Sequence, residues 1–309
     1  MSQAEPTARE KATAEGEATA ETVPGAPRRL RSLGLFRSEL TLTFRRWRTV
    51  ALLGVPAAVP VLIGIAVRIE TSGGGTVGGG GPEGAGGPAF VAQITNNGLF
   101  LVFAALAATL PVFLPMAVGV IAGDSVAGEA SAGTLRYLLV APAGRTRLLF
   151  AKFAAVCAFC LVATLVVAVS AFAVGALFFP LGEVTTISGV PISFAEGLWR
   201  AVLISVVVAA SLTGLAAIGL FVSTLTGSGV AAMASTVGLL IVVQILDSVP
   251  QLDAIHPYLF THHWLSFADL MREPVLWDEV LKNLGLQGAY AAVFGSAAWA
   301  RFTTKDITA

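Results

Sequence analysis

The chain has 309 residues, of which 55% are hydrophobic and 12% are charged, and its formal net charge is zero. A mean hydropathy of +0.80 excludes a soluble globular domain, because such domains are about 45–50% apolar and about 25% charged. The balanced charge gives no reason to expect a nucleic-acid partner.

The first 27 residues are rich in Ala, Glu, Thr and Pro and nearly lack large apolar side chains. Such a segment buries too little apolar surface to offset the conformational entropy lost on folding. We therefore predict a disordered tail over residues 1–27.

A basic amphipathic helix is predicted over residues 28–48. Apolar residues recur there at spacings of three and four, and arginines fall mainly on the other face. The apolar stripe consists of Leu33, Phe36, Leu40, Phe44 and Trp47. A helix of this kind lies at a membrane surface, against anionic lipid. The pattern fits a simple membrane anchor and a helix that also contacts a partner equally well.

Five apolar runs follow, each close to the roughly 20 residues that a helix needs to cross a bilayer. They occupy residues 49–67, 99–122, 153–179, 201–222 and 230–246, and a shorter sixth run occupies 284–300. Only helices satisfy their own backbone hydrogen bonds in lipid without closing a barrel, and the runs lack the alternation of barrel strands. We predict an all-α polytopic membrane protein, with a six-helix transmembrane domain over 49–300 and a C-terminal tail over 301–309.

Four prolines fall within the first two runs, at Pro56, Pro60, Pro111 and Pro115. A proline in a helix interior removes one backbone hydrogen bond and clashes with the preceding turn. Bends are therefore expected at these positions.

The distribution of Lys and Arg predicts an orientation. Nine precede the first run, four lie between residues 136 and 152, and two follow the sixth run, whereas the segments on the other side hold four. Positive residues concentrate in cytoplasmic loops, so both termini are expected in the cytoplasm. Arginine outnumbers lysine, and Ala, Gly and Val are abundant. This composition indicates a GC-rich bacterial source, and hence the bacterial cytoplasmic membrane.

The sequence shows no nucleotide-binding loop, zinc-protease helix or serine-nucleophile motif, so we expect no catalytic site. The centres of the runs lack charged residues and histidine, which disfavours ion-coupled transport. Cys157 and Cys160 share a helix face within the third run and are interpreted as small packing residues.

Three histidines gather in the long segment between the fifth and sixth runs: His256, His262 and His263, near Asp253 and Asp269. A metal site is one interpretation. Adjacent histidines on a helix point about 100° apart, so both cannot easily reach one ion. We favour polar residues at the membrane interface beside an aromatic belt, and expect neither metal nor cofactor in this chain.

The longest predicted cytoplasmic connection reads GDSVAGEASAGTLRYLLVAPAGRTR, over residues 123–147. A short helix is predicted over residues 134–140, opened near Gly133 and ended by Pro142. Leu135, Leu138 and Leu139 would form an apolar ridge on it. An exposed apolar ridge on the aqueous side of a membrane protein favours a partner groove.

The pattern GE-x-x-x-GTLRYLLVAP-x-GR-x-R-x-x-x-x-K resembles the loop after the second span in permease subunits of ABC-2 type exporters. In that family the loop forms a coupling helix that docks on an ATPase. The matching positions here are Glu129, Gly133, Thr134, Leu135, Leu139, Pro142, Arg145 and Lys152. Leu138 joins the implied docking surface through the apolar ridge.

The resemblance implies a permease subunit of an ATP-driven exporter, without enzymatic activity of its own. ATP and Mg would be bound by a separate ABC ATPase, present in two copies, and a second permease copy would complete the path as a homodimer. The uncharged bundle favours a hydrophobic or amphipathic cargo. The alternative is a non-transporting membrane scaffold or sensor that recruits a cytoplasmic partner.

Overall fold

The computed structural model describes residues 28–72, 88–133 and 144–304. The predicted disordered tail over 1–27 and the short helix over 134–140 lie outside these ranges. Residues 305–309 of the predicted C-terminal tail also lie outside them, whereas residues 301–304 belong to the last helix of the chain.

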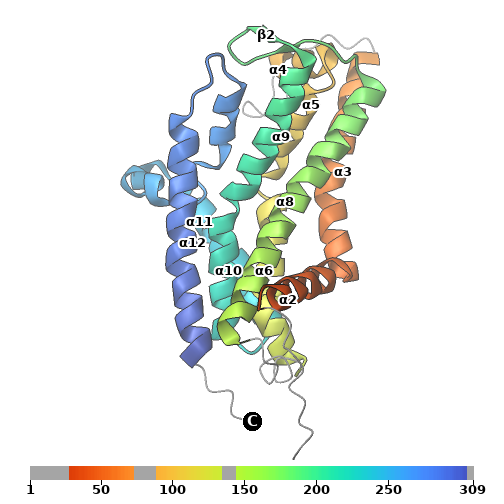
Figure 1. Cartoon of the computed structure of the whole chain (residues 1–309). Helices are drawn as coiled ribbons and strands as arrows, with labels where there is room; N and C mark the ends of the chain where they lie inside the picture. Colours follow the sequence, from red (N-terminus) through yellow and green to blue (C-terminus); the bar gives the residue numbers. More distant parts are fainter. Residues whose placement is uncertain (1–27, 73–87, 134–143, 305–309) are drawn as a thin grey trace, which may run out of the picture.

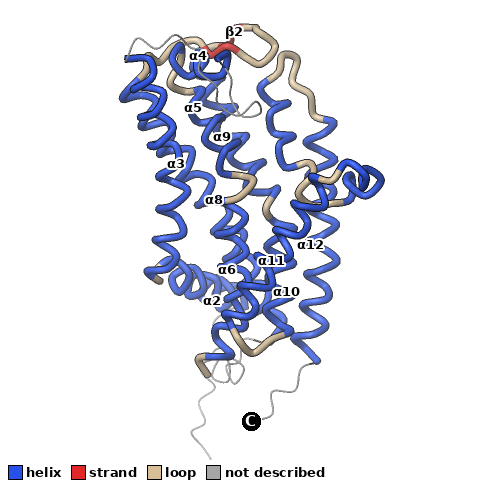
Figure 2. The backbone as a smooth tube through the Cα atoms, turned by 180° about the vertical axis from the view of Figure 1, so that it is seen from behind, coloured by secondary structure: helices blue, strands red, loops and turns tan. Residues whose placement is uncertain are grey.

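Ten α-helices account for most of the described chain, and several run along one long axis (Figures 1 and 2). They are α2 (Arg28–Phe44), α3 (Trp47–Ser72), α4 (Pro88–Asn96), α5 (Phe100–Thr109), α6 (Phe113–Ser131), α8 (Arg145–Phe178), α9 (Phe194–Ser211), α10 (Thr213–Leu225), α11 (Gly229–Ser248) and α12 (Asp278–Thr304). Two 3-10 helices join α11 to α12: η1 (Pro250–Tyr258) and η2 (Trp264–Met271). One antiparallel hairpin, β1 (Val184–Thr185) and β2 (Pro191–Ile192), pairs Val184 with Ile192.

Within the described ranges, five segments are long and apolar enough to cross a membrane: Trp47–Ser72, Phe113–Ser131, Arg145–Phe178, Phe194–Leu225 and Gly229–Ser248. The chain therefore has the make-up of an all-α polytopic membrane protein, as predicted. Helix α12, with 27 residues, is long enough to cross but does not belong to the five. Its first turns carry charged residues, together with the buried amides of Asn283 and Gln287, so the sixth span remains a prediction.

The second predicted run, 99–122, is not one helix. It breaks between α5 and α6, around Pro111. Pro111 has no N–H with which to continue the helical ladder, and Val112 leaves helical geometry at φ −127° and ψ −60°. The side-chain amide of Gln244, from α11, donates to the Pro111 carbonyl. Pro115 lies in the first turn of α6, where a proline is tolerated.

The fourth predicted run also consists of two helices, α9 and α10, which meet at Leu212. The hydroxyls of Ser211 and Thr213 donate to the carbonyls of Val207 and Ala210. Such back-bonding competes with the helical ladder and bends helices. By contrast, α3 runs continuously through Pro56 and Pro60.

Small residues set the closest helix contacts. Gly175 of α8 lies against Gly98, just before α5, so closely that a Cβ on either glycine would collide with the backbone of the other. A Cβ on Gly123 of α6 would lie 2.9 Å from the Cα of Met233 in α11. Close approach of backbones at small residues is typical of helix packing in membranes.

We predict that Gly175→Ala destabilises the protein, because the new methyl group would displace the backbone at Gly98; overpacking of this kind typically costs about 1–3 kcal/mol. The matched control is Gly238→Ala in α11, where a Cβ meets no atom within 4 Å. There the substitution removes glycine's entropy cost and should be neutral or mildly stabilising. Melting temperatures in detergent test the contrast, and equal melting of the two variants would contradict it.

The segment between α11 and α12 differs from the interfacial belt that was expected. Phe260, Trp264 and Phe267 are 2–3% exposed and belong to the core, whereas Tyr258 and Trp277 are exposed. The helix η1, drawn light blue in Figure 1, projects sideways from the bundle. Some aromatic side chains of this segment therefore pack in the core, and others lie on the surface.

A charged cluster at the α2 end of the bundle

Helix α2 lies across one end of the bundle, called here the α2 end, against α8 and α3 (Figure 1). The chain turns at Arg45 and Arg46 and enters α3 at Trp47. The Thr49 hydroxyl donates to the Thr43 carbonyl at 2.6 Å and closes this corner. The assignment of Trp47 to the apolar face of α2 was wrong: Trp47 is 81% exposed, because the corner precedes it.

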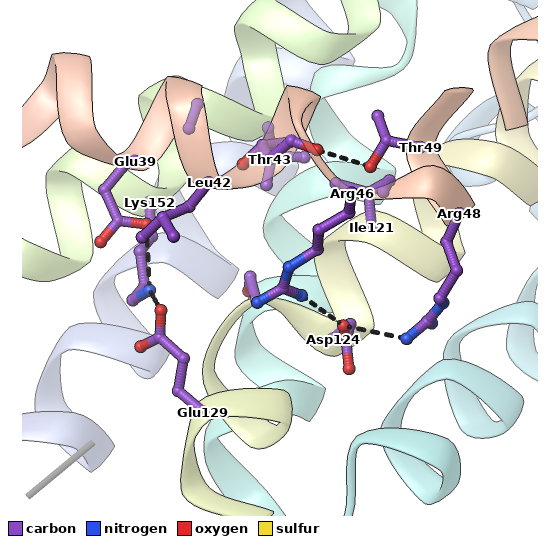
Figure 3. Close-up of a pocket in the computed structure, with 13 residues that line it drawn as sticks. Glu39, Leu42, Thr43, Arg46, Arg48, Thr49, Ile121, Asp124, Glu129 and Lys152 are labelled. Carbon is purple, nitrogen blue, oxygen red and sulfur yellow. Dashed lines mark hydrogen bonds and ion pairs between the residues drawn. The ribbon is translucent and has the colours of Figure 1, made fainter. Parts of the chain in front are cut away.

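The most buried charge at the α2 end is Lys152, in the second turn of α8, with 2% exposure. Its ammonium lies 2.5 Å from Oε1 of Glu129 in α6 and 3.1 Å from Oε2 of Glu39 in α2. Both glutamates are also buried. Figure 3 shows the ammonium between the two carboxylates. One cation thereby joins three helices.

A second ionic group lies beside the first. Asp124 of α6 accepts from Arg46 at 2.9 Å and from Arg48 at 3.5 Å. The two arginine side chains are about half exposed, whereas Asp124 is mostly covered. Arg48 also reaches the sulfur of Met233 in α11 at 2.9 Å. The corner between α2 and α3 is thus linked to α6 and α11.

Together the two groups hold three carboxylates and three cations, so the cluster is formally neutral. We call these six residues the ionic cluster: Glu39, Arg46, Arg48, Asp124, Glu129 and Lys152. The cavity that they line has a volume of only about 40 Å³, enough for water but not for a substrate. Arg46, Arg48 and Asp124 also line an adjoining cavity of about 310 Å³. The buried ion pairs of the cluster join α2, α6 and α8.

The end of α6 is held from its other side by α10. The hydroxyl of Ser223 donates to the Gly123 carbonyl at 2.6 Å and accepts from the backbone N–H groups of Val126 and Ala127. These bonds are buried. The last turns of α6 are consequently fixed by helices on several sides.

The predicted docking residues divide into two groups. Thr134, Leu135, Leu138, Leu139 and Pro142 lie outside the described residues. Glu129, Gly133 and Arg145 are described and flank that segment.

The resemblance places Glu129 on the surface that would dock on an ATPase. Glu129 is 7% exposed and paired with Lys152, because α6 continues to Ser131 and carries Glu129 into the bundle. Gly133, with φ +70°, ends α6, as glycine commonly does. The helix that it is predicted to open lies outside the described residues. Arg145 is the first residue of α8 and donates to the Thr303 carbonyl near the end of α12 at 3.0 Å.

Sequence reasoning missed the roles of Glu39 and Lys152. In the sequence, Lys152 stands out only as the last matching position of the exporter motif, directly before the third apolar run. In the structure α8 begins seven residues earlier, at Arg145. Glu39 is the one acidic residue between residues 28 and 48. A lone acid in a basic helix, together with a lone lysine beside an apolar run, was the available signal for the pair.

A protein family described as "Protein of unknown function (DUF2705)" matches residues 87–308, which is 222 of the 309 residues. The chain belongs to the DUF2705 family. A comparison with the curated proteins found no match. The matched region includes Asp124, Glu129 and Lys152 and leaves out α2 and α3, so the ionic cluster joins the DUF2705 region to the helices before it.

We predict that Lys152→Met destabilises the protein by about 3–5 kcal/mol, because it leaves two buried carboxylates without their cation. Arg48→Ala is the control. Arg48 is about half exposed and its pair with Asp124 is long, at 3.5 Å, so this pair should contribute no more than about 1 kcal/mol. Denaturant unfolding in detergent micelles measures both.

A triple variant tests the cause. Lys152→Met with Glu39→Gln and Glu129→Gln removes all three charges together, and it should recover much of the stability that the single variant loses. If the triple variant is as unstable as the single one, the loss comes from the shape of the lysine side chain and not from unpaired charge.

Proposed function

We propose that this protein is the transmembrane permease subunit of an ATP-driven ABC exporter of the ABC-2 type. In this proposal the cytoplasmic partner is an ABC ATPase in two copies, which binds ATP and Mg. A second copy of the chain completes the translocation path. The protein would lie in the bacterial cytoplasmic membrane with both termini inside, in agreement with the charge distribution.

The observation that carries the proposal is the placement of the ionic cluster around the segment that resembles a coupling helix. That segment leaves α6 after Gly133 and enters α8 at Arg145. Glu129 of α6 lies four residues before Gly133, and Lys152 of α8 lies seven residues after Arg145. These two side chains form an ion pair that joins the two helices. The ends of the segment are therefore attached to helices whose relative position is fixed by a buried ion pair.

Such an attachment supports force transmission. A displacement of the segment by a partner would act on the last turns of α6 and the first turns of α8. The ion pair between Lys152 and Glu39 would transmit the displacement to α2. The hydrogen bond between the Ser223 hydroxyl and the Gly123 carbonyl would transmit it from α6 to α10. Rigid elements joined in this way move as bodies, which is what a switch between inward- and outward-open states requires.

The proposed cargo class rests on an apolar cavity at the same end of the bundle, between α8 and α12. Its volume is about 510 Å³. Among its lining residues are Phe150, Phe153, Leu220 and Trp299. A cavity of this size and character accepts an acyl chain or another hydrophobic group, and so supports a hydrophobic or amphipathic cargo.

A non-transporting membrane scaffold or sensor is the alternative function. It would use the same cytoplasmic segment to recruit a partner, but it would not turn over ATP in response to a cargo. ATP hydrolysis by the co-purified complex, measured with and without candidate lipids or drugs, distinguishes the two functions.

The docking test is the double variant Leu135→Ala with Leu139→Ala. Loss of the apolar ridge should weaken association with the ATPase by at least tenfold, since about 1.4 kcal/mol already corresponds to that factor. Co-purification of the ATPase and export should fall together, while membrane insertion and melting temperature stay unchanged.

The matched control is Leu177→Ala with Leu181→Ala, a pair with the same spacing of four, exposed near the end of α8 that lies farther from α2. This control should retain the ATPase. Normal ATPase recovery with the Leu135/Leu139 variant would show that the segment is only a connector.

The orientation is tested by cysteine labelling in a background that lacks Cys157 and Cys160. Ser72→Cys, at the exposed end of α3, should react with an impermeant reagent added outside. Ser131→Cys, at the exposed end of α6, should react only after the membrane is opened. The reverse result would invert the topology and place the proposed docking segment outside.

A further inference from the structure

A second polar cluster lies far from the ionic cluster, where α11 ends and the connection to α12 begins. It brings together Asp247, His256 and His262. One possible ligand atom from each residue lies within 4.8 Å of the others. In sequence these residues belong to three separate pieces: the last turn of α11, the helix η1 and the link before η2.

We propose that Asp247, His256 and His262 form a binding site for a divalent transition-metal ion of the zinc type. Two imidazoles and one carboxylate with an open position are a ligand set found for such ions. Bonds of about 2.0–2.2 Å to one ion would require side-chain shifts of about an ångström from the present separations.

Outer contacts already orient two of the three ligands. The Nε2 atom of His256 lies 3.1 Å from the Leu246 carbonyl. A carbonyl only accepts, so this bond places the proton on Nε2 and leaves the Nδ1 lone pair for an ion. The hydroxyl of Thr261 donates to Oδ2 of Asp247 at 3.2 Å. Oδ1 of Asp247 lies 2.7 Å from Nδ1 of His262, a contact between two of the proposed ligands that a bound ion would replace. Outer contacts such as those to Leu246 and Thr261 fix metal ligands in place.

The surroundings favour a cation with an open position. Asp247 lies next to the last residue of α11, where the negative end of the helix dipole stabilises positive charge. Asp247 and His262 also line a cavity of about 290 Å³ beside the break at Pro111. Trp264 lines the same cavity, and its indole N–H is buried and finds no partner in the described part of the chain. That donor suits a water or anion held by the ion.

His263 belongs elsewhere. Its Nδ1 lies 3.2 Å from Oε2 of Glu279, at the start of α12. Lys282, hydrogen-bonded to Glu279, holds the pKa of that carboxyl below its usual range, and His263 contributes to the same shift. The argument that adjacent histidines cannot share an ion therefore holds for His262 and His263. The sequence interpretation overlooked Asp247, which replaces His263 in the cluster.

The test uses the full chain in detergent, purified with a tag free of histidine and stripped by a chelator. Zinc is then added, and bound metal is counted by mass spectrometry after gel filtration. We expect about one zinc per chain. The variants His262→Gln, His256→Gln and Asp247→Asn should each weaken zinc binding by more than about a hundredfold, beyond the 10- to 100-fold that loss of an outer contact gives. Thr261→Val should fall within that outer-contact range.

His263→Gln is the matched control and should bind zinc as the wild type does, as should a variant in which Cys157 and Cys160 are alanine. Zinc should raise the melting temperature of the wild type and of both controls, but not that of His262→Gln. The His262 side chain is 36% exposed, so this variant should remain folded even if substitution of buried His256 does not allow folding. Absence of zinc binding by the wild type, or equal losses for His262→Gln and His263→Gln, would overturn the site.

Discussion

The structure depends most on one buried cation. Lys152 lies between two glutamates from different helices, with all three side chains removed from water. Each charge is tolerated there only because of the others, since a lone ion in such surroundings would cost several kcal/mol. Helices α2, α6 and α8 consequently cannot separate without exposing or isolating a charge. The buried ion pairs therefore fix the positions of α2, α6 and α8 relative to one another more narrowly than apolar contacts alone would.

The remaining contacts are of a different physical kind. Along the bundle, small residues allow backbones to approach closely, as Gly175 and Gly98 do. In a membrane these contacts depend on van der Waals packing, because lipid offers apolar side chains an environment as favourable as another helix. The molecule thus combines shape-dependent packing along its length with charge pairing at the α2 end. Substitutions that change side-chain volume should weaken the packing along the bundle, whereas substitutions that change charge should weaken the α2 end.

Four of the five segments that are long and apolar enough to cross a membrane could be located from the sequence, because length and apolarity suffice to define them. The second predicted run, 99–122, was misplaced, since the candidate there is Phe113–Ser131. The breaks were predicted less well. Pro111 predicted a bend, and in the structure the helix ends there. The break at Leu212 was not predicted, because no proline lies near it in the sequence.

The two polar clusters could be predicted only in part. His256 and His262 stand out in the sequence as possible metal ligands, but their partner Asp247 and the pairing of Glu39 with Lys152 do not. Glu39 and Lys152 are 113 residues apart, and Asp247 meets His262 only because the chain folds back through η1. Such pairings are set by tertiary structure, which no local pattern contains.

The connection between Gly133 and Gly144 has a geometric consequence. Its two ends belong to α6 and α8, which the ion pair of Glu129 and Lys152 holds together. Eleven virtual bonds of a fully extended chain span at most about 40 Å. A chain that must leave and return between neighbouring anchors therefore extends no farther than about 20 Å from them. A soluble partner that bound this connection would therefore have to approach to within about 20 Å of the two helices.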